Sequence, residues 1–251
     1  MKALITGASS GIGREFAMIF AREGYDLVLV ARKEDRLLEL KLAIESAHFV
    51  QVDLVIEDLS VDGAAQRIFN LVLDRKIDVL VNNAGTGDFG FFVESDLERS
   101  TRMVHLNIVA LTELTRLFLP GLVERHSGHV LNVASIAAFV PGPNMSVYYA
   151  SKAYVVSFSA ALANELQGTG VTVTTLCPGP THTEFDRAAG TDWGETYRKH
   201  LPTGKQVAEY GYHAMKSGKQ IAIYGFANRL MVFLARFLPS QVLASVVRKW
   251  N

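Results

Sequence analysis

The chain of 251 residues has little of several features that mark particular classes of protein. It contains a single cysteine, Cys177, so it cannot form an internal disulfide and suits a reducing compartment. Its 25 basic and 25 acidic residues balance, which argues against a nucleic-acid binder, because such proteins usually carry a basic excess. Its apolar runs are far shorter than the ~18 residues that indicate a membrane span. Residues 1–5 lead straight into a glycine turn, so we expect no signal peptide and a cytoplasmic protein.

Apolar residues, in contrast, make up 49% of the chain, enough for a sizeable core. Short β-branched runs alternate with longer amphipathic segments along the sequence. Strands are expected at 2–6, 26–31, 49–57, 77–82, 129–134, 171–177 and 219–224, and helices at about 11–23, 33–47, 61–75, 96–125, 148–167 and 204–217. The strands are almost continuously apolar, which is typical of parallel strands covered on both faces. The pattern predicts an α/β fold over 1–251: a single Rossmann-type domain with a doubly wound parallel sheet of about seven strands, flanked by helices.

A glycine-rich turn joins the first expected strand to the first expected helix. It reads Thr6-Gly7-Ala8-Ser9-Ser10-Gly11-Ile12-Gly13, with the spacing Gly-x-x-x-Gly-x-Gly. Glycines let the backbone approach a diphosphate, and the free N–H groups at a helix start attract its charge. We therefore predict a dinucleotide site with contacts from Gly7, Ser9, Ser10, Gly11, Ile12 and Gly13. The alternative is a turn that serves only helix–strand packing.

The residue after the second expected strand indicates which dinucleotide binds. An acidic residue there would hydrogen-bond the ribose hydroxyls of NAD, but this chain has Ala31-Arg32-Lys33. A guanidinium suits a 2′-phosphate through its charge and its rigid fork of donors. Arg32 therefore predicts NADP(H), unless it is only a solvated charge at the start of a helix.

Further motifs follow in order: Asn82-Asn83-Ala84-Gly85, Asn107, Ser135, Tyr148-x-x-x-Lys152 and Pro178-Gly179. Together with the glycine turn they resemble the short-chain dehydrogenase/reductase superfamily over about residues 1–185. The resemblance implies an NADP(H)-dependent oxidoreductase similar to carbonyl reductases, acting on a small-molecule carbonyl or alcohol. It also implies a homodimer or homotetramer.

Four side chains form the expected catalytic set: Asn107, Ser135, Tyr148 and Lys152. Reduction of a carbonyl needs a proton donor at the developing alkoxide, and Tyr148 suits that role. Lys152 lies one helical turn further on, where its charge should lower the tyrosine pKa from its ordinary value near ~10. Ser135 ends an apolar strand and can donate to the substrate oxygen. By resemblance, Lys152 also holds the nicotinamide ribose and Asn107 holds a proton-relay water. Tyr149 lacks the four-residue spacing to a lysine, so it is expected to line the pocket or to pack.

The remaining cofactor contacts are implied by the resemblance. Asn83, Ala84 and Gly85 would lie along the adenosine, and Pro178, Gly179, Thr181 and Thr183 beside the nicotinamide, with Thr183 on the carboxamide. Two Asp-Leu pairs could serve the adenine, Asp53-Leu54 and Asp58-Leu59. The apolar alternation puts Asp53 inside the strand, so Asp58 and Leu59 are preferred. His182 has no acidic partner at a supporting spacing and is not expected to be catalytic, and no metal site is expected.

Aromatic and apolar residues in loops indicate a lipophilic substrate, with 179–203 closing as a lid. They are Phe89, Phe91, Phe92, Phe139, Val140, Pro141, Met145, Phe185, Trp193 and Tyr197; the alternative is that several complete the core or an oligomer interface. The segment 226–251 has apolar residues at helical spacing on either side of Pro239, and basic residues between them. This helical extension could cover the pocket, pair with a second subunit or touch an anionic membrane. Glu209 is the last acidic residue, and six basic residues follow it.

The primary prediction is thus an NADP(H)-dependent oxidoreductase that transfers hydride between nicotinamide and a lipophilic carbonyl or alcohol. Two alternatives stay open. One is a 3-oxoacyl reductase of fatty acid synthesis, from whose pattern the basic, apolar carboxyl terminus departs. The other is an NADP-binding regulator or scaffold without catalysis, against which the intact catalytic set argues, since binding alone requires no proton donor.

Overall fold

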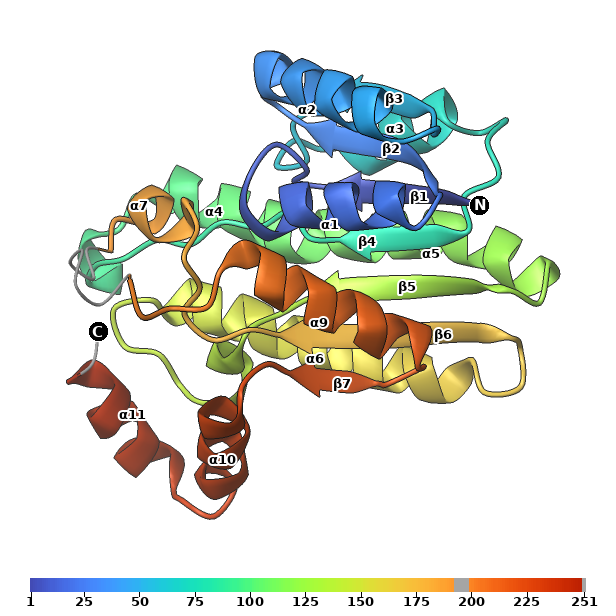
Figure 1. Cartoon of the computed structure of the whole chain (residues 1–251). Coiled ribbons are helices and arrows are strands. Elements are labelled where there is room, and N and C mark those ends of the chain that lie inside the picture. Colours follow the sequence, from blue (N-terminus) through green and yellow to red (C-terminus); the bar gives the residue numbers. More distant parts are fainter. Residues whose placement is uncertain (192–198, 250–251) are drawn as a thin grey trace.

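The computed structural model describes residues 1–191 and 199–249 (Figure 1). Seven parallel strands form one sheet in the order β3-β2-β1-β4-β5-β6-β7. They are β1 Lys2–Thr6, β2 Asp26–Ala31, β3 Val52–Ile56, β4 Val79–Asn82, β5 Gly128–Val133, β6 Val171–Cys177 and β7 Ile221–Ile223. The predicted doubly wound Rossmann-type sheet is therefore confirmed.

Helices cover both faces of the sheet (Figure 1). They are α1 Gly11–Arg22, α2 Glu34–Ala47, α3 Ala64–Leu71, α4 Leu97–Val104, α5 Ala110–Glu124, α6 Ser146–Glu165, α7 Phe185–Ala189, α9 Gly204–Lys216, α10 Phe226–Ala235 and α11 Ser240–Arg248. α1, α2 and α9 pack with Ile5 and Leu29 on one face, while α3 and α5 pack with Leu4 and Val28 on the other. Successive strand residues thus enter opposite cores, which explains the near-continuous apolar strands.

The sheet order reverses direction between β1 and β4. Chain connections from β1 run toward β3 on one side, and those from β4 run toward β7 on the other. In open α/β sheets, ligands bind outside the carboxyl ends of the strands at such a switch point. The glycine turn after β1 and the Asn83–Gly85 loop after β4 both lie there.

The expected helix at 96–125 is interrupted. α4 and α5 are joined by one π-helical segment, His105–Val109, which contains Asn107. Single π turns inside α-helices occur frequently at functional sites. By length and composition, Leu97–Glu124 could cross a membrane, with 39% of its most apolar window buried, but the α5 part packs on the sheet and contributes Leu114, Phe118 and Leu122 to the core.

Candidate active site

The glycine turn after β1 is held open by its own geometry and by a neighbouring loop. Gly7 and Gly11 have φ of 65° and 53°, in the left-handed region that favours glycine. A Cβ on Gly13 would overlap the Gly7 carbonyl and the Asn83 amide. The turn therefore needs glycine at Gly7, Gly11 and Gly13 to keep this shape.

Thr6 and Asn83 brace the turn against the loop after β4. The Asn83 side-chain amide donates to the carbonyl oxygens of Thr6 (2.9 Å) and Gly7 (3.3 Å). The Thr6 hydroxyl oxygen accepts from the backbone N–H groups of Asn83 and Ala84, both at 3.0 Å. The Asn83 side chain is thus engaged in positioning the turn, so its contact to a cofactor would come from the loop backbone. Sequence reasoning did not single out Thr6 for this role.

The start of α1 is available to an anion. Ser10 is the N-cap residue of α1, and it makes no side-chain capping hydrogen bond. The first N–H groups of the helix are therefore left without a capping side chain, beside backbone held open by glycine. These donors fit a diphosphate.

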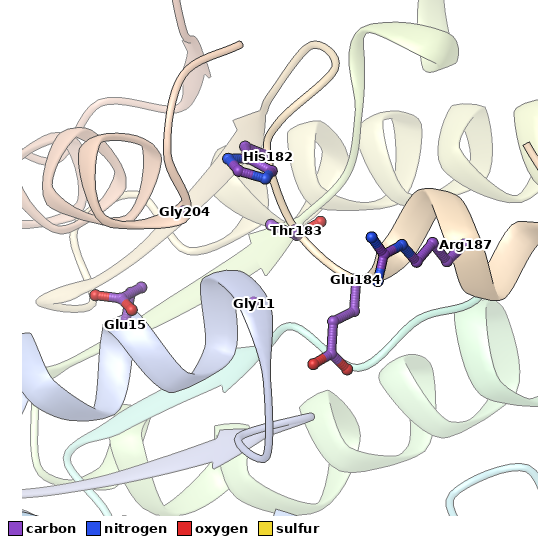
Figure 2. Close-up of a pocket in the computed structure, with 7 residues that line it drawn as sticks. All are labelled: Gly11, Glu15, His182, Thr183, Glu184, Arg187 and Gly204. Atoms are coloured by element: carbon purple, nitrogen blue, oxygen red, sulfur yellow. The ribbon is translucent and has the colours of Figure 1, made fainter. Parts of the chain in front are cut away.

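Figure 2 shows the pocket between this helix start and the loop after β6. It is lined by Gly11, Glu15, His182, Thr183, Glu184, Arg187 and Gly204. The Thr183 side chain lies against Gly11, so the loop carrying the predicted carboxamide contact reaches the glycine turn. Glu184 accepts a hydrogen bond of 2.6 Å from Arg36 of α2, which joins the two sides of the predicted dinucleotide site. His182 lies at the base of the loop, where its N–H donates to the Pro202 carbonyl (2.9 Å).

Arg32 and Asp58 lie together at the other end of the predicted dinucleotide site. Arg32 is 64% exposed, and its guanidinium lies 3.7 Å from the Asp58 carboxylate. Arg102 of α4 donates to the same carboxylate at 2.8 Å, a contact that sequence reasoning missed. Burial raises the pKa of Asp58, but hydrogen bonds from Ser60 and the charges of Arg32 and Arg102 outweigh it, and the net pKa is lowered. Asp58 is therefore an anionic acceptor between two guanidinium groups.

The two Asp-Leu pairs differ in position as the alternation indicated. Asp53 lies within β3 and forms ion pairs with Lys2 and Arg75, whereas Asp58 lies beyond the carboxyl end of that strand. Leu59, however, is only 6% exposed and packs in the core on the α3 and α5 face. A cofactor contact from Leu59 would thus have to come from its backbone.

Tyr148 and Ser135 meet at the carboxyl edge of the sheet. Tyr148 lies in the first turn of α6, and Ser135 follows β5 as the N-cap of the 3-10 turn Ile136–Phe139. Burial raises the pKa of Tyr148 to about 12, although its hydrogen bond with Ser135 acts in the opposite direction. The expected net lowering of the tyrosine pKa is wrong for this structure, because the cost of burying the phenolate outweighs the interactions that favour it.

Lys152 lies on the same face of α6 as Tyr148, as the spacing predicted. Its Nζ is 5.8 Å from the centroid of the Tyr148 ring and donates to the Val133 carbonyl at 3.0 Å. The residue is 5% exposed, and burial lowers its pKa to about 8. Burial thus shifts both pKa values toward the neutral forms, the phenol and the amine.

Asn107 joins the loop after β4 to α6. Its amide nitrogen donates to the Thr86 carbonyl (2.9 Å) and to the Ser151 hydroxyl (3.0 Å), and its amide oxygen accepts from Thr86 N–H (3.0 Å). A Cβ on Gly85 would lie 3.3 Å from both Asn107 Oδ1 and Lys152 Nζ, so these two side chains flank the same point. The side chain of Asn107 therefore fixes the Gly85–Thr86 backbone beside Lys152. Thr86 and Ser151 are partners that the motif reading did not identify.

Aromatic side chains and a methionine line the predicted substrate side of the site. The ring centroids of Phe185 in α7 and of Tyr148 are 5.4 Å apart. A Cβ on Gly87 would lie 3.0 Å from the Phe185 ring and 3.3 Å from Met145, so all three residues are close together. Tyr149 packs flat over Gly142, where a Cβ would overlap its ring, in agreement with packing, one of the two roles expected for it. Thr181 is buried and donates to the Gly179 carbonyl at 2.8 Å. Trp193 and Tyr197 of the expected lid lie outside the described residues.

Among the described residues, no cluster of His, Cys, Asp and Glu could hold a metal ion. What the site offers is a glycine cradle with free N–H donors, a basic and acidic pair at one end, and a tyrosine, lysine and serine at the other. This arrangement can hold a nicotinamide dinucleotide and offers a tyrosine as proton donor, and it defines a nicotinamide-dependent oxidoreductase of the Rossmann class.

The family model for the short chain dehydrogenase matches residues 1–193, and the chain belongs to this family. An uncharacterized oxidoreductase from Staphylococcus saprophyticus is 35% identical over 216 residues, covering 85% of this chain and 90% of that protein. Sulfoacetaldehyde reductase 2 from Chromohalobacter salexigens is 40% identical over 186 residues (72% and 73%). The very-long-chain 3-oxoacyl-CoA reductase from Rattus norvegicus is 34% identical over 180 residues, which cover 70% of this chain and 58% of that enzyme.

Solved structures agree with this assignment. A short-chain dehydrogenase from Sphingobium yanoikuyae in complex with NADPH has a TM-score of 0.85 and 33% identity, covering 94% of this chain and 93% of that one. The bulky-bulky ketone specific alcohol dehydrogenase from Comamonas testosteroni has a TM-score of 0.80 and 29% identity (94% and 92%). A short-chain dehydrogenase/reductase from Burkholderia phymatum in complex with NAD has a TM-score of 0.83 and 28% identity (93% and 92%). The chain is thus an NAD(P)-dependent oxidoreductase that acts on alcohol or carbonyl groups.

Proposed function

We propose that the chain is an NADP(H)-dependent reductase of lipophilic ketones or aldehydes. The observation that carries the proposal is the convergence of Ser135, Tyr148 and Lys152 beside the glycine turn, at the carboxyl edge of the sheet. When bound, NADP(H) supplies or accepts the hydride. Gly7, Ser9, Ser10, Gly11, Ile12 and Gly13 would hold its diphosphate, with Arg32 at the 2′-phosphate.

The side chains of the protein would donate the proton and bind the substrate oxygen. The Tyr148 hydroxyl, whose pKa burial raises to about 12, carries its proton at neutral pH and donates it to the carbonyl oxygen as negative charge develops there. The Ser135 hydroxyl orients the same oxygen by hydrogen bonding. The Lys152 ammonium stabilises the phenolate left behind, and Asn107 keeps the loop beside Lys152 in position.

The preference for NADP over NAD is supported by Arg32 and by the absence of an acidic residue at that position. Because Asp58 lies 3.7 Å from Arg32, the guanidinium is held near the end of β2, where a 2′-phosphate would lie. A neighbour in complex with NADPH and another in complex with NAD show that the fold accepts either cofactor. The discrimination must therefore come from this chain's own residues.

A lipophilic substrate is supported by the apolar walls formed by Met145 and Phe185 next to Tyr148. A 3-oxoacyl-CoA is the second candidate, because the Rattus norvegicus relative bears that substrate in its name. We further propose a cytoplasmic setting, supported by the single free cysteine, Cys177.

The proposal is tested by following NADPH consumption against ketones, aldehydes and 3-oxoacyl-CoA esters of graded size, with NADH in parallel. We expect turnover of bulky apolar ketones, a loss of at least about a hundredfold in kcat for Tyr148→Phe, and unchanged NADPH binding in that variant. Arg32→Ala should raise the KM for NADPH by about tenfold and leave NADH unaffected, while Arg22→Ala at the far end of α1 changes neither. NADPH binding without any turnover would instead favour a cofactor-binding regulator, and a preference for small charged keto acids would contradict the lipophilic substrate.

A further inference from the structure

Two surfaces of the chain expose large apolar side chains and carry opposite charge. The first, which we call the basic hairpin, is residues 226–249, comprising α10 and α11. Eight large apolar residues on it are each at least 45% exposed: Phe226, Leu230, Phe233, Leu234, Phe237, Leu238, Val242 and Val246. Its four charged residues, Arg229, Arg236, Arg248 and Lys249, are all basic and exposed. Within the described chain, α11 has no buried residue, so it packs little surface against its own domain.

The second surface, which we call the acidic segment, is residues 88–98 between β4 and the first turn of α4. It exposes five large apolar residues, from 37% for Phe89 to 90% for Val93; the others are Phe91, Phe92 and Leu97. Its four charged residues, Asp88, Glu94, Asp96 and Glu98, are all acidic. Asp88 is paired with Arg99 at 3.1 Å, Glu98 lies 4.0 Å from Arg102, and the Asp96 side chain caps α4. Glu94 and Glu98 are both exposed, so their charges face solvent. The two surfaces thus have matching apolar character and opposite charge.

Both surfaces border the candidate active site. The start of α10 packs on the 3-10 turn that follows Ser135, and Asn228 lies against Gly179 of the loop after β6. The acidic segment continues directly from Gly87, which approaches Met145 and Phe185 in the substrate wall. In Figure 1 the basic hairpin projects from the body of the molecule, with its α11 at the end where the strands finish.

We propose that the basic hairpin docks on the acidic segment of a second copy of this chain, and that the contact is reciprocal about a two-fold axis. In such a dimer the hairpin of each subunit lies on the acidic segment of the other, so both apolar surfaces are buried and both sets of charges are paired. An anionic bilayer would suit the basic hairpin, but it would repel the acidic segment and leave that segment's apolar side chains exposed. A second copy satisfies both surfaces.

This docking has a consequence for the active site. The acidic segment forms the continuation of the substrate wall, so a hairpin seated on it supplies apolar side chains of the second subunit next to the opening. The substrate opening would then be shared between two chains.

The test is disulfide trapping between two differently tagged chains, one carrying Phe233→Cys and the other Val93→Cys. The native Cys177 is fully buried, and burial raises its thiol pKa to about 12, so it adds little background. We expect a mixed disulfide between the two chains at micromolar concentration, separated by size on a non-reducing gel. Phe49→Cys, at a position outside both surfaces that is even more exposed than Val93 (112% against 90%), replaces Val93→Cys as the control and should form none with Phe233→Cys.

A charge exchange checks that the ion pairs contribute. Arg236→Glu with Arg248→Glu, or Glu94→Arg with Glu98→Arg, should each lower the mixed-disulfide yield several-fold, and combining the two on opposite chains should restore it. Lys216→Glu with Lys219→Glu, basic residues outside the hairpin, should leave the yield unchanged.

Three results would overturn the proposal. One is no mixed disulfide while NADPH binding is intact, which separates this failure from a failure of the proposed function. Another is a disulfide only between two Phe233→Cys chains, which would mean that hairpins pair with each other. The last is hairpin-dependent binding to phosphatidylglycerol vesicles by monomeric protein, which would make a lipid surface the occupant.

Discussion

Lys152 is a buried cation, and its burial has a measurable effect on stability. The folded pKa is about 8, below the ordinary value of 10.5, so between these two values the unfolded chain binds a proton that the folded chain lacks. Stability therefore rises with pH across this window, and below about pH 8 the full cost of burying the charge remains. Tyr148 acts in the opposite sense, because its raised pKa causes stability to fall only above about pH 10.

Replacing Lys152 with Met should remove the part of the pH-dependent rise in folding stability that Lys152 causes. From about pH 8 to about pH 10 we expect wild-type stability to gain roughly 2 kcal/mol from Lys152, whereas the Lys152→Met chain gains nothing at this position. Urea unfolding at a series of pH values measures the difference between the two chains, so that titrations common to both cancel. Parallel curves for the two chains would show that Lys152 keeps an ordinary pKa.

Gly13 is a second residue whose environment permits a direct prediction. A Cβ there would overlap the Gly7 carbonyl and the Asn83 amide, which are held by the bracing hydrogen bonds of the turn. Gly13→Ala should therefore cost about 1–3 kcal/mol of stability and weaken NADPH binding by displacing the turn. Gly204→Ala is the matched control for the stability measurement, because a Cβ there would meet its nearest atoms at 3.5 Å, an ordinary contact. Calorimetry gives the stability of both variants and fluorescence titration the NADPH affinity of Gly13→Ala, and equal losses of stability in the two variants would refute the packing argument.

At the scale of elements, α2 and the loop after β6 are joined across the proposed dinucleotide site by Arg36 and Glu184. Both side chains are substantially exposed, at 40% and 59%, so the pair contributes little to stability. Its effect should be on ligand binding, since Glu184 places a carboxylate in the pocket that would receive a diphosphate. The hydrogen bond from Arg36 lowers the pKa of Glu184, so the carboxylate is charged at neutral pH.

Glu184→Gln should therefore tighten NADPH binding several-fold, because it removes a negative charge and releases Arg36 to the phosphates. The gain should shrink at high salt, where exposed charges are screened. Titrations of intrinsic fluorescence at low and high salt measure both effects. Glu165→Gln, at the end of α6 and outside the pocket, is the control, and weaker binding by Glu184→Gln would show that the bridge itself supports the bound cofactor.

The alternation of strands and helices was readable from the sequence because each element has its own apolar period. β2 was predicted at its observed bounds, and the spacing of Tyr148 and Lys152 placed both side chains on one face of α6. The π turn around Asn107 was not predicted, since no short sequence motif marks it. The partners of the Asn107 side chain were also missed, because Thr86 and Ser151 belong to other parts of the chain. The strand predicted at 49–57 is shorter, since only Val52–Ile56 pair with β2.

The parts of the candidate site that lie within short sequence motifs were predictable. Contacts between distant segments were missed, such as Arg102 with Asp58, 44 residues apart, because nothing in either local sequence specifies the partner. The sign of the tyrosine pKa shift was also missed. Sequence spacing shows the neighbouring lysine, but the burial that raises the pKa of Tyr148 depends on the packing of Phe185 and the loops around it.

At the scale of the whole molecule, the charge balance separates into two unlike parts. Residues 210–251 hold six basic residues and no acidic one, and the remainder holds the opposite surplus. If the basic hairpin docks on the acidic segment of a second copy, association should weaken as salt rises but should not vanish, because the apolar contacts persist. Sedimentation velocity at low and high salt measures this. Association that strengthens with salt would mean that apolar contact alone holds the subunits.

The position of β1 in the sheet has a consequence for synthesis. β1 is synthesised well before β4, yet it lies between β2 and β4, with Ala3 paired to Val79 on the far side. During synthesis the second edge of β1 is therefore covered only after Val79 has emerged from the ribosome, 76 residues after Ala3. Until then an apolar strand edge is exposed, so nascent chains of this protein should bind chaperones early and release them once β4 is complete.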